Sequence, residues 1–141
     1  MNRGHMINKS KLSRGFTLVE LMIVVVIVGM LTAVSMGFYG DYVTDASRTD
    51  GRSALTTMAA AGEKCKALNG AYNHATCAAL FPFTSDDGYY QVTGVATATT
   101  YTMTATPIAG QRQANDTDCT SLTLTNTGVK GGTGADPSQC W

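Results

Sequence analysis

The 141-residue sequence has room for one globular domain of ordinary size, and its net charge of zero hides an uneven distribution of charge. Residues 1–15 hold four basic and no acidic side chains, whereas the remainder holds six basic and ten acidic ones. Only one of the two histidines, His74, follows this N-terminal segment, which excludes most catalytic sites built on a nucleophile and a base. We therefore do not expect an enzyme.

An apolar run follows the basic segment directly. Residues 16–40 contain one charge, Glu20, and exceed the roughly 20 residues with which a helix crosses a hydrocarbon core. Basic flanks stay in the cytoplasm, so we expect a single pass through the inner membrane with residues 41–141 on its periplasmic side. A secretory signal would be cut after such a run, but Val34-Ser35-Met36 fits that cleavage pattern poorly. The run is therefore expected to be retained, whether translation starts at Met1 or Met6.

The helix is predicted to continue past the apolar run, over residues 16–68. From residue 41 the chain turns polar without a stop signal, and Asn69-Gly70 is the first pair typical of a helix end. Apolar side chains recur at spacings near three and four and predict a face that packs against the rest of the chain: Tyr42, Ala46, Ala54, Leu55, Met58, Cys65 and Leu68.

The remainder predicts a small antiparallel sheet packed on the second half of this helix. Residues 71–87 indicate a loop that ends in a turn at Asp86-Asp87-Gly88, which lacks the later oxygen ligands of a calcium loop. Residues 89–95, 99–106 and 120–125 alternate as half-buried strands do, and residues 126–141 indicate a glycine-rich loop. The expected class is α+β.

All four cysteines lie after residue 40, where disulfides persist if this part leaves the cytoplasm. Three pairings are possible, and we favour Cys65 with Cys77 and Cys119 with Cys140, because each closes a short segment between predicted elements. No pair has the CxxC spacing of a metal site, so we expect neither a metal nor a cofactor.

The string from Arg14 to Met22, RGFTLVELM, strongly resembles the start of the type IV prepilin family. The resemblance implies cleavage by a prepilin peptidase between Gly15 and Phe16 and methylation of the new Phe16 amine. It further implies the type IV pilin fold and an inner-membrane assembly platform that packs the chain with other pilins into a filament. The parts would be a leader (1–15), a transmembrane and filament-core helix (16–40) and a periplasmic head (41–141).

Glu20 is unusual because a carboxylate inside an apolar helix costs about 3 kcal/mol in a membrane. In the prepilin family the corresponding glutamate pairs with the terminal amine of a neighbouring subunit, so the resemblance gives Glu20 and Phe16 this role in assembly. A tolerated glutamate near a helix end is the alternative. Gly29, Gly37 and Gly40 weaken the helix, which fits either local unwinding in a filament or close packing of small residues. Many major pilins have a proline where this chain has Gly37, which favours a minor pilin.

The run from Asp118 to Lys130, with the closing Gln139-Cys140-Trp141, resembles the PilE-type minor pilins, a group related to the competence pilin ComP. Cys119 and Cys140 would then close a loop like the D-region of type IV pilins. The implied function is pilus assembly or initiation, and through it twitching motility, adhesion or DNA uptake in a Gram-negative bacterium. A major pilin and a type II secretion pseudopilin are the alternatives within this class.

A ComP-like DNA receptor is the second functional hypothesis. The resemblance implies DNA binding by a basic face near the C-terminal loop, but only Arg112 and Lys130 follow Leu68, against five aspartates. Three tyrosines at strand positions could stack on bases, although such residues more often pack in a sheet: Tyr89, Tyr90 and Tyr101. Asn115-Asp116-Thr117 matches a glycosylation sequon, a triplet that is common by chance.

Overall fold

The computed structural model describes residues 15–141. Contacts divide the chain into one unit that ends at Phe38 and a second unit, Tyr39–Trp141, which we call the head. Helix α1 (Leu18–Asn69) runs through both units, within two residues of the predicted bounds. Thr17 caps its start, because its Oγ1 accepts a hydrogen bond of 3.2 Å from the Glu20 N–H. Gly70 follows its end with φ of +83°, the left-handed conformation expected at a helix stop.

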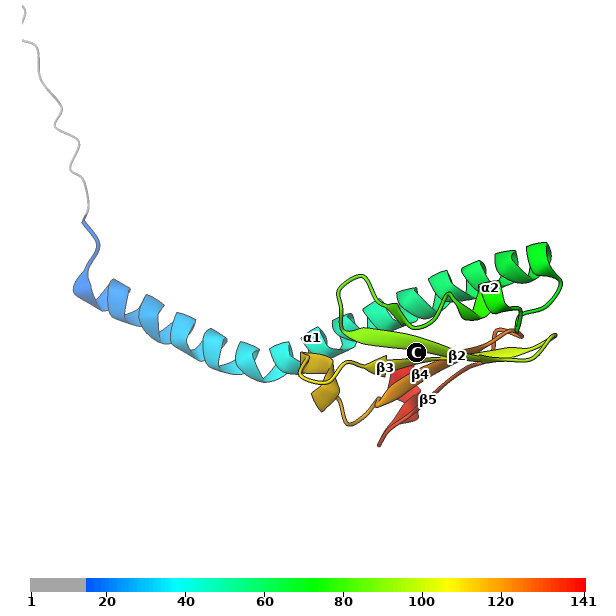
Figure 1. The fold of residues 1–141 in the computed structure, drawn as a ribbon. Helices are drawn as coiled ribbons and strands as arrows, with labels where there is room; N and C mark the ends of the chain where they lie inside the picture. The colour runs from blue at the N-terminus through cyan, green and yellow to red at the C-terminus, as the bar shows by residue number, and fades with distance from the viewer. Residues whose placement is uncertain (1–14) are drawn as a thin grey trace, which may run out of the picture. The chain divides into compact units, whose positions relative to one another are not determined.

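The head contains a five-stranded antiparallel sheet whose strand order follows the chain, and the part of α1 inside the head covers one face of it (Figure 1). The strands are β1 (Phe83–Thr84), β2 (Tyr90–Ala96), β3 (Tyr101–Pro107), β4 (Ser121–Thr125) and β5 (Lys130–Thr133). The α+β class and the long helix are confirmed, and the three predicted strands correspond to β2, β3 and β4. The strands β1 and β5 were not predicted, and neither were helix α2 (Ala75–Ala78) and the 3-10 helices η1 (Arg112–Asn115) and η2 (Pro137–Cys140).

Strand β5 was not predicted because two of its four residues are glycines, and packing explains the glycine at position 132. A Cβ atom on Gly132 would lie 2.5 Å from the Cys140 Sγ and 2.7 Å from the Ser121 carbonyl oxygen. Packing of the disulfide against β5 therefore requires glycine there, and glycine removes the alternating pattern by which a strand is predicted. The prediction that residues 126–141 form only a loop was wrong for this reason.

The core lies between α1 and the covered face of the sheet. Leu55 and Met58 of the helix pack with inward-facing strand residues, and the largest fully enclosed apolar side chains are Tyr90, Leu55, Met103, Leu122 and Val92. Gly51 allows the close approach of helix and sheet, because a Cβ atom there would lie 3.0 Å from the Tyr90 ring and 3.1 Å from the Leu122 Cδ1. This packing supplies the core that the sheet alone would lack.

The buried face of α1 begins with polar residues and not with the predicted apolar ones. Ala54, Leu55, Met58 and Cys65 are buried as predicted, but Tyr42 and Leu68 are 74% and 77% exposed, and Ala46 is also exposed. Ser47, Arg48 and Asp50 are buried in their place. The spacing of apolar residues could not predict this face, because Arg48 and Asp50 make hydrogen bonds to loops that lie far away in the sequence.

Candidate functional site

The first part of α1 presents apolar side chains on all sides within its unit. Residues 15–35 are all exposed, and the window Leu18–Ser35 is long and apolar enough to cross a membrane. Gly15, Phe16, Thr17 and Glu20 line a shallow hollow at the start of α1, so the residues predicted for cleavage and assembly lie close together. Residues 1–14, which include most of the expected leader, lie outside the described part of the chain.

Glu20 also has a local structural position that the sequence analysis did not use. It is the third residue of α1 and follows Thr17 with the spacing Thr-x-x-Glu, which is typical of a capping box. A carboxylate in the first turn also interacts favourably with the helix dipole. Glu20 is thus compatible with the start of the helix before any partner subunit is considered.

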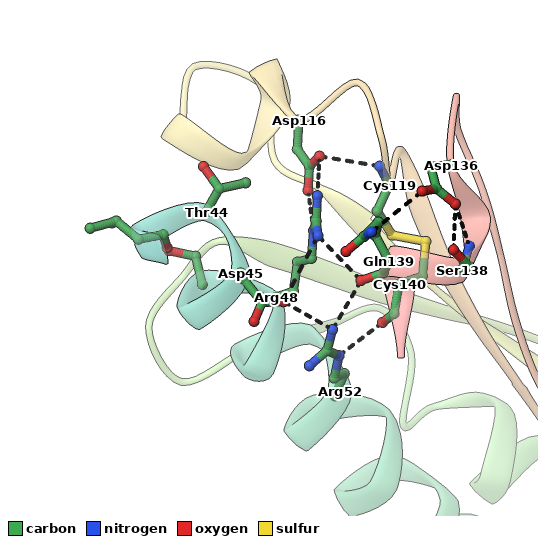
Figure 2. A network of polar contacts seen from close by, with 12 residues as sticks. Thr44, Asp45, Arg48, Arg52, Asp116, Cys119, Asp136, Ser138, Gln139 and Cys140 are labelled. Carbon is green, nitrogen blue, oxygen red and sulfur yellow. Dashed lines mark hydrogen bonds and ion pairs between the residues drawn. A yellow bond between two sulfur atoms is a disulfide. The ribbon is translucent and has the colours of Figure 1, made fainter. Parts of the chain in front are cut away.

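A buried ion pair joins α1 to the loop after η1. The Arg48 guanidinium donates from Nε to one carboxylate oxygen of Asp116 at 2.7 Å and from Nη2 to the other at 2.8 Å (Figure 2). The two side chains are 6% and 2% exposed. Gln113 of η1 and the Cys119 N–H donate to the same carboxylate, at 2.7 and 3.1 Å. Asp116 therefore has four donors, which satisfy a charge taken out of water.

The pKa values of this pair move in the directions that favour both charges. Burial alone would raise the pKa of Asp116, but the hydrogen bonds from Arg48 and from the Cys119 N–H outweigh it and hold the pKa below its ordinary value. The hydrogen bond to Asp116 likewise raises the pKa of Arg48. The pair is therefore ionised at neutral pH.

Two arginines of α1 also hold the last residues of the chain (Figure 2). Arg48 Nη1 and Arg52 Nη2 donate to the Gln139 carbonyl oxygen at 3.2 and 3.1 Å, and Arg52 Nε donates to the Cys140 carbonyl oxygen at 2.8 Å. Asp45 lies beside them, 3.3 Å from Arg52 and 3.8 Å from Arg48. We call Arg48, Arg52, Asp116 and the Gln139 and Cys140 carbonyls the arginine clamp.

The disulfides are Cys65–Cys77 and Cys119–Cys140, the two pairs that the sequence analysis favoured. The first joins the last turns of α1 to α2, and the second joins Cys119, two residues before β4, to η2. The second bond and the arginine clamp meet at Cys140, so a covalent link and a polar network both secure the C-terminal segment. The expected disulfide-closed loop is confirmed.

The predicted turn at Asp86-Asp87-Gly88 is held by a second buried carboxylate of the helix. Asp50 accepts hydrogen bonds from the N–H groups of Asp87 and Tyr89, at 3.2 and 3.3 Å, and from the Ser85 hydroxyl. Gly88 has φ of +75°, which suits the turn. These residues stabilise the connection to β2.

The two candidate DNA contacts lie on different elements. Arg112 is exposed at the start of η1, where it shares a hollow of about 670 Å³ with Asp41, Asp45 and Asp118. Lys130 is exposed at the start of β5, with its Nζ 4.8 Å from the ring centroid of Trp141. The Trp141 indole N–H in turn donates to the Gly131 carbonyl oxygen at 2.7 Å. The carboxylates beside Arg112 weaken the positive potential there.

The sheet itself offers little for nucleic acid. Tyr90 and Tyr101 are buried in the core, burial raises the pKa of Tyr90 to about 12, and Tyr89 is half-buried, so the first two are not available to stack on bases. The strands β2, β3 and β4 contain no charged residue, and their open face carries mainly hydroxyl groups: Thr93, Thr102, Thr104, Thr106, Thr123 and Thr125. A phosphate contact on the sheet must therefore come from its edge strand or from the loops around it.

His74, the one histidine outside the N-terminal segment, caps α2 by accepting a hydrogen bond from the Thr76 N–H on its Nδ1. Within residues 15–141, no group of three or more His, Cys, Asp or Glu side chains is arranged to hold a metal ion. The sequon residue Asn115 is exposed at the end of η1.

The sequence analysis missed the arginine clamp. A partial signal exists, because Arg48 and Arg52 are four residues apart and so share one face of a helix. Apart from the nearby Asp45, their partners are one carboxylate and two backbone carbonyls, at separations of 68 to 91 residues. A pattern of residue types cannot reveal acceptors that belong to the backbone.

Comparison with known proteins places these features in a family. The chain is 42% identical over 53 residues to a fimbrial protein of Pseudomonas aeruginosa, which covers 38% of the chain and 34% of the relative. It is 48% identical over 42 residues to the type IV major fimbrial protein FimA of Dichelobacter nodosus, which covers 30% of the chain and 26% of the relative. The chain thus matches about a third or less of the length of these curated relatives.

The fold is that of a solved type IV pilin. The non-core minor pilin PilV of Neisseria meningitidis superposes with a TM-score of 0.56 at 19% identity, covering 67% of the chain and 91% of that protein. A family model for the prokaryotic N-terminal methylation motif matches residues 10–36. A second model, described as type IV minor pilin ComP, DNA uptake sequence receptor, matches residues 38–123, more than half of the chain. The chain therefore belongs to the type IV pilins, within the family of the minor pilin ComP.

Proposed function

We propose that this chain is a structural minor subunit of a type IV pilus, held in the inner membrane by residues 16–40 until it joins a filament. The observation that carries the proposal is the exposed apolar surface of residues 16–35. At about 25 cal/mol per Å² such surface strongly disfavours exposure to water, so it needs either lipid or the matching helices of other pilins. Movement from one to the other keeps it buried throughout.

Glu20 favours movement of the helix from the membrane into the filament. In lipid its carboxylate lacks a partner, and a buried charge without a partner is costly. We propose that cleavage by a prepilin peptidase between Gly15 and Phe16 creates a methylated Phe16 amine, and that Glu20 pairs with this amine on a neighbouring subunit at the assembly platform. Residues 41–141, which make up nearly all of the head, lie on the periplasmic side before assembly and on the filament surface afterwards.

The first test is the N-terminus of the native protein. Mass spectrometry of the chain purified from cells is expected to give a sequence that begins with N-methylated Phe16. An intact leader, or cleavage after residue 40, would contradict the proposal.

The second test separates a minor subunit from a major one and from a secretion pseudopilin. Immunoblots of sheared filaments are expected to detect the chain at a low level relative to the major pilin. Deletion of the gene should reduce surface pili, whereas a pseudopilin would leave them unchanged.

The role of Glu20 is tested in the same way. Glu20→Ala should remove the chain from filaments while leaving it in the membrane fraction. Glu20→Asp is the matched control because it keeps the charge.

A second candidate function is reception of DNA for uptake, which the match to the ComP family favours. Arg112 and Lys130 are the exposed cations of the head beyond α1, and phosphate neutralisation is the main source of affinity for DNA. The full chain in detergent should bind duplex DNA with an affinity that falls as salt rises. Arg112→Ala and Lys130→Ala should each reduce the salt dependence by about one charge.

A further variant and a negative result complete the test of DNA binding. Asp118→Asn removes a carboxylate from the hollow beside Arg112 and should strengthen binding if Arg112 contacts DNA. Absence of binding to any duplex at low salt would reject the DNA candidate and leave the assembly role untouched.

A further inference from the structure

We propose that Arg48 and Arg52 are positioning residues that hold the two candidate DNA contacts, Arg112 and Lys130, in one fixed arrangement. This inference rests on DNA reception, the second candidate function above. Neither arginine is assigned a contact with DNA; each acts through the segment that it holds.

The guanidinium groups of these arginines are already committed inside the head. The Arg48 side chain is 6% exposed and that of Arg52 is 25% exposed. Between them they donate two hydrogen bonds to Asp116 and three to the Gln139 and Cys140 carbonyls. Charges engaged in this way are poorly placed to neutralise phosphate groups, so their contribution has to be indirect.

One branch of the clamp leads to Arg112. Arg48 fixes both carboxylate oxygens of Asp116, and Gln113, the residue after Arg112, donates to one of them at 2.7 Å. Gln113 has no exposed surface, so η1 is fastened through a fully buried side chain. The backbone that carries Arg112 is therefore set by the ion pair.

The other branch leads to Lys130. Arg52 holds the Cys140 carbonyl, and the next residue, Trp141, donates its indole N–H to the Gly131 carbonyl at 2.7 Å. The Trp141 ring lies 4.8 Å from the Lys130 Nζ, within the range of a cation–π interaction. Displacement of the C-terminal segment would remove the ring on which this cation rests.

Both branches start from a single turn of α1, because residues 48 and 52 are four apart. A surface held from one rigid element loses less conformational freedom when it binds, which raises affinity without any added contact. The clamp therefore preorganises the surface that carries Arg112 and Lys130.

The test uses the full chain in detergent and two variants. Arg48→Lys keeps the positive charge but cannot make the paired hydrogen bonds to Asp116 together with the bond to Gln139. Arg52→Gln removes the donor to the Cys140 carbonyl at a partly exposed site where water can replace it. The matched control is Lys64→Gln, which removes one positive charge from an exposed position of the same helix.

Two readouts are needed. Trp141 is the only tryptophan of the chain, so quenching of its fluorescence reports directly on the C-terminal segment. Both variants should make Trp141 fluorescence more sensitive to an added quencher. Both should also raise the Kd for DNA roughly tenfold, which corresponds to the free energy of one hydrogen bond to a charged group. Lys64→Gln should change neither value, and Arg52→Lys should recover part of the affinity.

The outcomes separate the two proposals. Unchanged quenching in Arg48→Lys and Arg52→Gln would overturn the positioning role. An equal loss of affinity in Arg52→Gln and Lys64→Gln would overturn it for Arg52, because the loss of one positive charge would then explain both results. If the unaltered chain binds no DNA, the DNA candidate fails by itself. Trp141 quenching in the same variants then decides whether the arginines position this surface.

Discussion

Arg48 connects three segments of the head through one side chain. It contacts Asp116, the Gln139 carbonyl and, at 3.8 Å, Asp45. A buried ion pair stabilises a fold only when its hydrogen bonds are complete, and removal of one partner leaves the other charge buried without compensation. The consequences of substitution are therefore unequal for single and double variants.

Arg48→Met should lower the free energy of unfolding by about 3 to 5 kcal/mol, because Asp116 would remain buried without its cation. Adding Asp116→Leu should recover part of this loss, although the Cys119 N–H would then lack its acceptor. Urea unfolding of the full chain in detergent measures both values. A double variant no more stable than the single one would show that the ion pair is not the dominant interaction here.

The pH dependence of stability follows from the lowered pKa of Asp116. A carboxyl whose pKa is lower in the folded than in the unfolded chain contributes stability above its ordinary pKa of about 4. That stability is lost as pH falls through the lower folded value. Melting temperatures measured from neutral to acidic pH should drop more steeply for the unaltered chain than for Asp116→Asn; parallel curves would contradict this.

At the level of elements, the close packing of α1 on the sheet limits the size of the side chain at position 51. Gly51→Val should destabilise the head by about 1 to 3 kcal/mol, because the added atoms meet the Tyr90 ring and the Leu122 side chain. Gly40→Val is the matched control in the same helix, since a Cβ atom there has no neighbour within 4 Å. Thermal unfolding followed by near-ultraviolet circular dichroism compares the two. Equal stability of both variants would mean that the helix and the sheet can move apart enough to fit the added atoms without a loss of unfolding free energy.

The elements also show where sequence reasoning succeeds and where it fails. Alternation predicted β2, β3 and β4, because one face of each strand is buried and the other is open. The strand β1 has only two residues and β5 has two glycines, so neither carries a periodic signal. The buried polar face of α1 was missed because Arg48 and Asp50 are satisfied by partners that no local pattern reveals.

At the scale of the whole molecule, the features with local sequence signals were the most predictable. The apolar run, Glu20 and the motif around Gly15 and Phe16 are contiguous in the sequence, and the family models match both this region and the head. The arginine clamp depends on contacts between residues 68 to 91 positions apart, so only the folded chain brings it together. The disulfide pairing was accessible because four cysteines allow only three arrangements.

The order of the strands implies an order of events when the head is made. Each strand neighbours its predecessor in the sequence, so the chain can add hairpins one after another as it folds. Gln139 and Cys140, however, follow all five strands in the sequence, so the helix arginines gain these acceptors only after the last strand has been made. The arginine clamp is therefore completed after the sheet.

A chain cut after Ser138 tests the importance of this last step. It would retain all five strands but lose the Cys119–Cys140 bond, worth about 3 kcal/mol for a loop of 21 residues, together with both carbonyls of the clamp. Pulse–chase immunoblotting should show that it is degraded faster than the complete chain, and equal lifetimes would count against the idea. Prematurely terminated subunits would then be removed before they could reach a growing fibre and block its extension.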